Sequence, residues 1–223
     1  MIEHRTESVS GGFRAVLLKC PKCREDLTGI AIDRVFFCRR CRIGVDFWED
    51  PPGIIPVIYA RCSEPADDKV LRLPVWRYRA DIRIETMTGN EEAARNARGA
   101  IPETVYVFGS VFQRLTLFGD PNVELTAAAP VLDMAGDPGE VIGCQLRREH
   151  ADRLLEPVAV SVIDKVQDVT DLDIRIVIRR RDLIALPFTV TGKLLKNPAS
   201  GIQINRMSFL MEPMLPIKAC NPG

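Results

Sequence analysis

The chain has 223 residues, of which 46% are hydrophobic and 27% are charged, a composition typical of a globular protein with a substantial core. Thirty basic residues balance thirty acidic ones, which argues against a global field that attracts nucleic acid or an anionic membrane. No apolar run approaches the roughly 20 residues of a membrane helix, and residues 1–7 lack a signal-peptide pattern, so we expect a cytoplasmic protein.

Two Cys-x-x-Cys pairs, fourteen residues apart, follow a polar and flexible N-terminal arm at residues 1–12. A short apolar run precedes each pair, at residues 15–18 and 34–37, and residues 26–29 supply a turn between them. The pairs are formed by Cys20, Cys23, Cys38 and Cys41. This spacing predicts one tetrahedral four-thiolate metal site, with zinc as the expected ion.

A site with four thiolate ligands leaves no open position for water, so it is expected to be structural rather than catalytic. Iron would suit the same ligands and is the alternative metal. A module this small cannot bury enough apolar area to fold alone, so metal binding and folding are expected to be one event. We therefore predict that Cys38→Ser unfolds this module and leaves much of residues 57–223 folded.

The segments Leu18-x-Cys20-Pro21-x-Cys23 and Phe37-Cys38-x-x-Cys41-x-x-Gly44 resemble the zinc-ribbon superfamily. The resemblance implies a zinc ribbon at residues 13–48, in which two knuckles at hairpins bring four sulfurs to one ion. Zinc ribbons occur in transcription factors, ribosomal proteins, enzymes and assembly factors, so the resemblance implies no particular activity. The chain departs from the family after the second cysteine of each knuckle, where many ribbons have glycine and this chain has Arg24 and Arg42.

Basic residues are concentrated around the knuckles, since residues 13–42 contain eight basic side chains and three acidic ones. A divalent ion with four thiolates carries a charge of about −2, so part of this excess neutralises the site. The remainder could form a basic surface for phosphate or an acidic partner, with Arg39 and Arg40 at a knuckle tip.

Residues 49–56 are interpreted as a linker, because Pro51-Pro52-Gly53 is incompatible with a helix. Residues 57–223 predict a β-rich domain of sandwich- or barrel-like form with one short helix, so the whole chain is expected to be mainly β (α+β). Strict alternation of apolar and polar residues from Trp76 to Glu85 predicts a half-buried strand.

The other expected elements follow from apolar runs and turn residues. A polar loop that is either mobile or carries a helical turn is predicted at residues 89–99, and a buried strand that could bend at Gly109 is predicted at 104–118. A helix is predicted at 145–156 that ends at Pro157, followed by two strands at 174–178 and 183–190 with a hairpin turn at 179–182, and by a strand around 202–204.

Other candidates for chemistry are weak. Cys144 and His150 are six residues apart, which places them on different faces of a helix, so Cys144 is interpreted as a core residue. Cys62 and Cys220 are expected to be reduced thiols. Asp168, Asp171 and Asp173 resemble a fragment of a calcium loop but lack its glycine turn and distal glutamate, so they are interpreted as solvated carboxylates.

Several arginines could line one face of the predicted sheet, opposite Trp76 and Tyr78. They are Arg77, Arg79, Arg83, Arg175 and Arg179. A platform for single-stranded nucleic acid needs aromatic and basic side chains on the same face, and this alternation separates them.

We therefore expect a non-enzymatic zinc-ribbon protein that acts as a protein-interaction or assembly module in a larger complex. The alternative is a nucleic-acid-binding protein that uses the basic ribbon surface. An enzyme with an unrecognised site in the β-rich domain and an iron-containing electron carrier are the remaining hypotheses. A protein partner is expected, and no membrane contact or small-molecule ligand.

Overall fold

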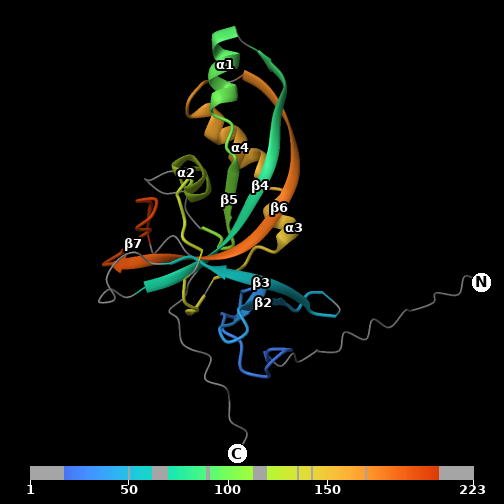
Figure 1. Cartoon of the computed structure of the whole chain (residues 1–223), viewed down its shortest axis with the longest axis vertical. Helices are drawn as coiled ribbons and strands as arrows, with labels where there is room; N and C mark the ends of the chain where they lie inside the picture. The colour runs from blue at the N-terminus through green and yellow to red at the C-terminus, as the bar shows by residue number, and fades with distance from the viewer. Residues whose placement is uncertain are drawn as a thin grey trace, which may run out of the picture.

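Two long antiparallel strands form the spine of the molecule (Figure 1). They are β4 (Val70–Thr88) and β6 (Thr170–Thr191). The predicted alternation at residues 76–85 lies within β4 and is confirmed. The computed structural model describes residues 18–49, 51–61, 70–88, 91–112, 120–134, 136–141, 143–168 and 170–205. The N-terminal arm, Cys62, Cys220 and the tail therefore lie outside the described residues.

The strands form one open, mixed sheet of eight strands in the order β1-β2-β3-β6-β4-β5, with β7 attached to β6 and β8 to β7. The shorter strands are β1 (Val35–Cys38), β2 (Ile43–Asp46), β3 (Gly53–Tyr59), β5 (Thr104–Phe108), β7 (Leu194–Lys196) and β8 (Gln203–Asn205). Among the described strands only β3 and β6 pair in parallel. The mainly β class is confirmed, whereas the sandwich- or barrel-like form is corrected to an open sheet.

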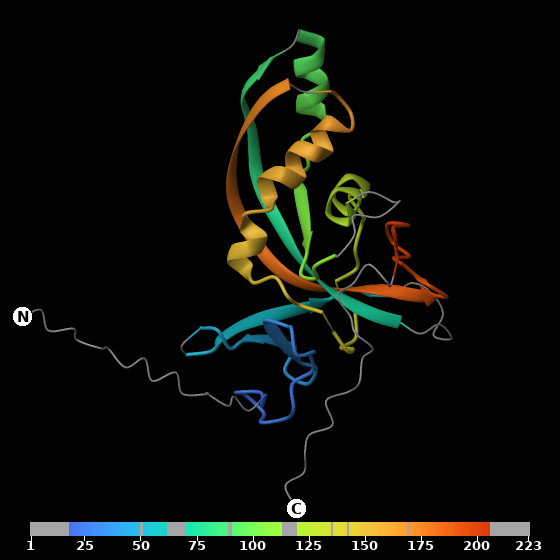
Figure 2. The same cartoon turned by 180° about the vertical axis from the view of Figure 1, so that it is seen from behind.

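Four helices are described, where the sequence predicted one. They are α1 (Glu91–Gly99), α2 (Pro121–Ala128), α3 (Arg148–Asp152) and α4 (Leu155–Asp164). Helices α1, α2 and α4 lie inside the curve of β4 and β6, and α3 lies beside the base of β6 (Figures 1 and 2). The buried residues of α4 are Leu155, Val158, Ala159, Val162 and Ile163, which is the spacing of one helical face.

The predicted end of a helix at Pro157 is wrong. Pro157 is the third residue of α4, and proline is tolerated in the first helical turn because the amide it lacks would have no partner inside the helix. The predicted loop at 89–99 is mostly α1. The predicted strand at 104–118 ends as β5 at Phe108, and residues 113–119 lie outside the described part of the chain.

The predicted hairpin turn at 179–182 is also wrong, because β6 continues through these residues. Arg179 is an extra residue opposite β4, since Arg79 pairs with Arg180 and the next residue of β4 pairs with Ile178. Each arginine of this stretch has a carboxylate partner: Arg179 contacts Asp81, Arg180 contacts Asp182 and Arg181 contacts Asp152. A polar run can therefore remain in the strand.

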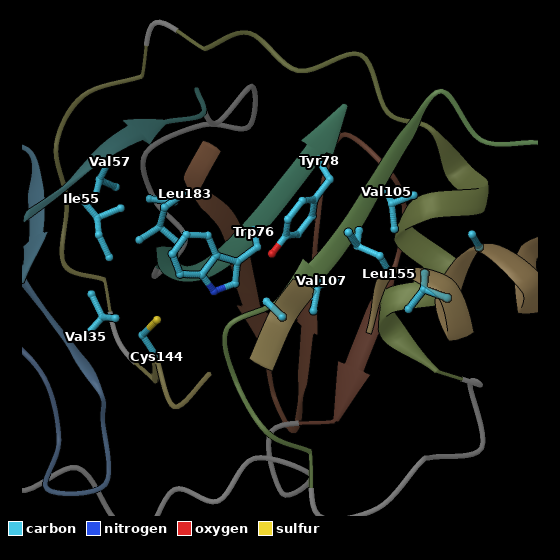
Figure 3. Packing of buried hydrophobic residues seen from close by; sticks show 14 of the residues in the cluster. Val35, Ile55, Val57, Trp76, Tyr78, Val105, Val107, Cys144, Leu155 and Leu183 are labelled. Atoms are coloured by element: carbon cyan, nitrogen blue, oxygen red, sulfur yellow. The ribbon is translucent and has the colours of Figure 1, made fainter. Parts of the chain in front are cut away.

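The four-cysteine module at residues 18–48, called the ribbon below after the sequence prediction, shares one hydrophobic core with the rest of the sheet. Val35 and Phe37 of β1 and Ile55 of β3 belong to the same buried cluster as Trp76 of β4 and Leu183 of β6. Figure 3 shows Val35, Ile55 and Cys144 on one side of the Trp76 ring and Val105 beyond Tyr78. A second cluster covers the other face of the sheet, around Phe108, Ile184 and Phe188.

Strand β3 occupies the second half of the segment interpreted as a linker. It pairs with β2 at residues 53–56 and with β6 at residues 57–59. The ribbon is therefore joined to the body of the molecule by a continuous sheet, which a flexible linker would not provide.

Residues 143–147 connect the ribbon to β4 and β5. On the ribbon side the amides of Arg34 and Val35 donate to the carbonyl of Cys144, at 2.7 and 3.2 Å. On the other side the amide of Leu146 donates to the Gly109 carbonyl at 2.8 Å, and Leu146 accepts a hydrogen bond from the Trp76 indole at 3.1 Å. The segment therefore fixes the orientation of the ribbon.

Replacing Phe37 with Ala is predicted to destabilise the whole described structure by about 3–5 kcal/mol, because its ring lies in the core shared by ribbon and sheet. Phe36→Ala is the matched control, since its neighbouring ring packs within the ribbon against Phe47. Urea unfolding combined with hydrogen exchange of β4 and β6 measures the effect. Equal protection of β4 and β6 in both variants would contradict the prediction.

Candidate metal centre

The two knuckles are held side by side by short strand pairings. Cys38 ends β1, and Cys41 lies in the turn that leads to β2. The first knuckle is closed by the Cys20 amide, which donates to the Glu25 carbonyl at 2.8 Å, and by the Arg24 amide, which donates to the Cys20 carbonyl at 2.9 Å. Two backbone hydrogen bonds between Thr28 and Phe37, each 2.8 Å long, join this knuckle to β1.

The sulfur atoms of the four predicted ligands lie within 4.8 Å of one another, and those of Cys23 and Cys38 are 3.5 Å apart. A tetrahedral ion with metal–sulfur distances of about 2.3 Å requires sulfur–sulfur separations of about 3.8 Å. Cys20 and Cys38 are buried, while Cys23 and Cys41 are partly exposed. The four cysteines could therefore hold a metal ion with little movement.

Both residues after the knuckles adopt the left-handed backbone conformation that many ribbons assign to glycine. The φ angles are 66° at Arg24 and 52° at Arg42. This conformation costs a non-glycine residue about 1–2 kcal/mol. The guanidinium of Arg42 lies 5.9 Å from the centre of the Tyr59 ring, so the arginine makes a contact that glycine would lack.

The thiols of the cluster cannot all ionise by themselves. Burial raises the pKa of Cys20, but hydrogen bonds from the Cys23 and Lys22 amides and from neighbouring thiols outweigh burial and lower the pKa to about 7. Hydrogen bonding with the Cys23 sulfur, together with desolvation, raises the pKa of Cys41 to about 12. A cation among the sulfurs is what would stabilise several thiolates at once.

Much of the positive charge of the ribbon is engaged within the molecule. Lys19 pairs with Asp26 at 2.6 Å and Arg40 pairs with Glu25 at 2.8 Å. Arg39 donates to the Pro138 carbonyl at 3.1 Å, and the Arg34 guanidinium lies 4.3 Å from the centre of the exposed Trp48 ring.

Two buried carboxylates lie where the ribbon meets residues 143–147. Asp33 accepts hydrogen bonds from the amides of Ile30 and Gly143, at 2.9 and 3.3 Å, and burial raises its pKa to about 6 against these hydrogen bonds. Asp46 accepts a hydrogen bond from Arg147 at 2.6 Å. The first carboxylate has no cation among its hydrogen-bond donors, whereas the second is neutralised by its partner.

The structure does not bring the other candidate residues into a site. Cys144 is fully buried, and burial together with the charges of Asp33 and Asp46 holds the pKa of its thiol well above its usual range. His150 lies on α3 and is exposed. Among the described residues, no metal-sized cluster of His, Cys, Asp or Glu side chains is found besides the four cysteines, so Asp168 and Asp173 do not contribute to one.

The predicted basic sheet face is confirmed in part. Arg79, Arg83, Arg175 and Arg179 are exposed on it. Arg77 differs, because it is buried and pairs with Asp182 at 2.5 Å. Trp76 and Tyr78 are buried.

A groove of ≈ 520 Å³ between β3 and β6 was not predicted. Its wall includes Arg180 and Arg181, which the sequence placed in a turn. One local pattern in the sequence could have indicated this groove, namely the run of arginines at 179–181. The run lies between two apolar stretches, which is compatible with a basic edge on one continuous strand.

Comparisons with protein-family models, with curated proteins and with solved structures return no match. None of the described helices is long and apolar enough to cross a membrane.

Cys38→Ser is predicted to remove metal binding and to lower the melting temperature of the whole described structure in one transition. The shared core changes the expectation drawn from sequence, because loss of the ribbon would uncover Trp76 and Leu183. Metal content per chain and thermal unfolding are the measurements. Cys144→Ser is the control, since it lies outside the cluster and is expected to retain one metal ion per chain. A separate, unchanged transition for the body would contradict this expectation.

Asp33→Asn is predicted to gain stability relative to the wild type as the pH rises from about 4 to about 6. The raised pKa means that the unfolded state releases its proton first, so ionisation of Asp33 lowers the stability of the wild type across this window. A rise in the pKa of Asp33 from the ordinary value of 3.8 to about 6 corresponds to a relative gain on the order of 2–3 kcal/mol by pH 7.

Urea unfolding of both proteins at the same pH values tests this, because any effect of acid on the thiolate cluster is common to both. Asp26→Asn is the control, since Asp26 is an exposed carboxylate of the same ribbon. A difference between Asp33→Asn and the wild type that stays constant from pH 4 to pH 7 would refute the prediction.

Proposed function

We propose that this chain is a non-enzymatic protein-interaction module, held in shape by a structural zinc ion and assembled with a protein partner in the cytoplasm. The observation that carries the proposal is the cluster of four cysteine sulfurs within 4.8 Å, which supplies a complete tetrahedral donor set from the protein itself. A closed site of this kind organises a surface and leaves no position for a substrate.

Zinc is proposed rather than iron because the function assigned to the ion is mechanical. Zinc has no redox chemistry, and four thiolates satisfy its preference for tetrahedral sulfur coordination. The ribbon continues into the sheet through β3 and shares its core, so an ion that stabilises the ribbon also supports the larger surface. A colourless protein with one zinc per chain is expected, and a red-brown sample with iron would contradict the choice of metal.

The titratable groups with shifted pKa values also support a structural interpretation. Asp33 is occupied by hydrogen bonds at the junction with residues 143–147, and Cys144 is fully buried in the core. Catalytic groups with shifted pKa values normally line a cleft that a substrate can enter.

Nucleic-acid binding through the ribbon has less support. Four of its basic side chains are already engaged with carboxylates, a carbonyl oxygen or an aromatic ring. A protein that contacts several phosphates would lose affinity steeply with added salt, so titration of an oligonucleotide at two salt concentrations distinguishes this hypothesis.

The chain, tagged at its natural locus, is predicted to elute from nuclease-treated host extract in an assembly larger than its own mass of 24.9 kDa. Native gel filtration with light scattering measures this, and affinity capture identifies the companion protein. Cys38→Ser is expected to lose the companion together with the metal. A monomer of the chain's own mass, with nothing captured in stoichiometric amount, would overturn the proposed function.

A further inference from the structure

The groove between β3 and β6 opens where the two strands diverge. They pair only at residues 57–59 of β3 and 183–185 of β6. On the N-terminal side of this pairing, β3 lies against the ribbon and β6 runs along β4 (Figure 1). The groove has a volume of ≈ 520 Å³. Its apolar part is formed by Ile55 and Ile58 of β3 and by Ile178 and Leu183 of β6.

One edge of β6 is free beside this groove. The other edge pairs with β4 along the strand, while the groove edge pairs with β3 only at residues 183–185 and with β7 only at residues 189–191. Within the described parts of the chain, residues 172–182 have no strand partner on that edge. Their backbone groups directed away from β4 are therefore suited to pair with an added strand.

The rim of the groove is strongly basic. It contains Arg148, Arg179, Arg180 and Arg181, with Asp182 as its one carboxylate. The guanidiniums of Arg179, Arg180 and Arg181 take part in ion pairs, but their side chains remain 64, 55 and 41% exposed. The Arg179–Asp81 pair is exposed on both sides and contributes only about 0–1 kcal/mol, and Asp182 keeps its pair with Arg77 when Arg180 is released, so an incoming carboxylate can share or replace these partners at small cost.

Two other occupants are disfavoured. A second copy of the chain pairing its own β6 edge would place arginines against arginines, which destabilises cross-strand pairs. Single-stranded nucleic acid requires accessible aromatic rings for its bases, and the one aromatic residue that lines the groove, Trp76, is only 1% exposed.

We propose that this groove binds an extended acidic segment of a partner protein. The segment adds as a strand to the free edge of β6, in the place that β3 leaves, and its carboxylates meet Arg179 and Arg180, which lie on the same face of the sheet as Arg79 and Asp81. Alternate apolar side chains of the segment contact Ile55 and Ile178. The proposal rests on the proposed function and names the chemistry of the partner.

The test uses a fluorescent seven-residue peptide of alternating Glu and Val with blocked ends, titrated with the full chain at low salt. Arg179→Gln combined with Arg180→Gln is predicted to weaken its binding at least about tenfold, which corresponds to two exposed charge pairs. Arg95→Gln combined with Arg98→Gln is the matched control, because these exposed arginines lie on α1 at the far end of the curved strands (Figure 1). Its predicted effect is less than about twofold, since α1 makes no contact with the groove.

Two further peptides separate strand addition from simple charge attraction. A copy N-methylated at every residue cannot donate backbone hydrogen bonds and is expected to lose binding, and the Gln–Val copy is expected to bind more weakly than the Glu–Val peptide. Hydrogen exchange of residues 174–182 should slow only with the unmethylated acidic peptide. Equal binding by the methylated peptide, an unchanged affinity of the groove variant, no binding at low salt, or displacement by oligothymidine would each overturn the proposal.

Capture from host extract separates this proposal from the broader one. A partner retained equally by the wild type and by the Arg179→Gln, Arg180→Gln variant would refute the acidic-strand site and leave the proposed function standing. Absence of any partner with either protein would refute the proposed function itself. Loss of the partner in the groove variant, together with selective binding of the acidic peptide, supports the site.

Discussion

Strand β3 pairs with the ribbon at one end and with the body of the molecule at the other, and the rest of the structure depends on this double pairing. Its first half pairs with β2 and its second half pairs with β6, so one backbone transmits the position of the ribbon to the long strands. Val35 and Trp76 then lie in one core, although 41 residues separate them in sequence. A module too small to fold alone is thereby stabilised from two sides, by its sulfur cluster and by burial against the sheet.

The seam between ribbon and body is polar as well as apolar, and its polar groups specify orientation. Arg147 donates to Asp46 across it, and Asp33 accepts from the backbone of Gly143. A buried carboxylate such as Asp33 contributes less stability than an apolar side chain of similar size, because ionisation in the interior is unfavourable. In return its directional hydrogen bonds are satisfied in one arrangement of ribbon and segment 143–147.

Local patterns predicted the features that local chemistry determines. The four cysteines, the alternating strand around Trp76 and the strand near Ile204 depend on spacing or alternation within a few residues, and the structure contains all three. The sequence also placed Arg24 and Arg42 at positions where many ribbons have glycine, and both residues adopt the left-handed backbone conformation there.

The features that sequence missed depend on partners distant in the chain. The arginines at 179–181 indicated a turn, but carboxylates at Asp81 and Asp152 stabilise them within a continuous strand. The prolines before β3 indicated a linker, but pairing with β6 makes the segment after them a strand. Helix α4 was missed for a local reason, because Pro157 was interpreted as the end of a helix, although the apolar spacing of residues 155–163 predicts one.

The position of β3 also connects the metal cluster to the groove. Ile55 faces the groove and lies within residues 53–56, which pair with β2. Strand β2 begins at Ile43, two positions after Cys41 of the second knuckle. Any change in the cluster that alters the β1–β2 hairpin therefore alters one wall of the groove, while the β6 wall stays paired with β4. If the proposed segment between these walls and the ion among the sulfurs both bind this arrangement of β3 better than any other, their binding is coupled. By thermodynamic linkage each must then strengthen the binding of the other, with no direct contact between the two sites.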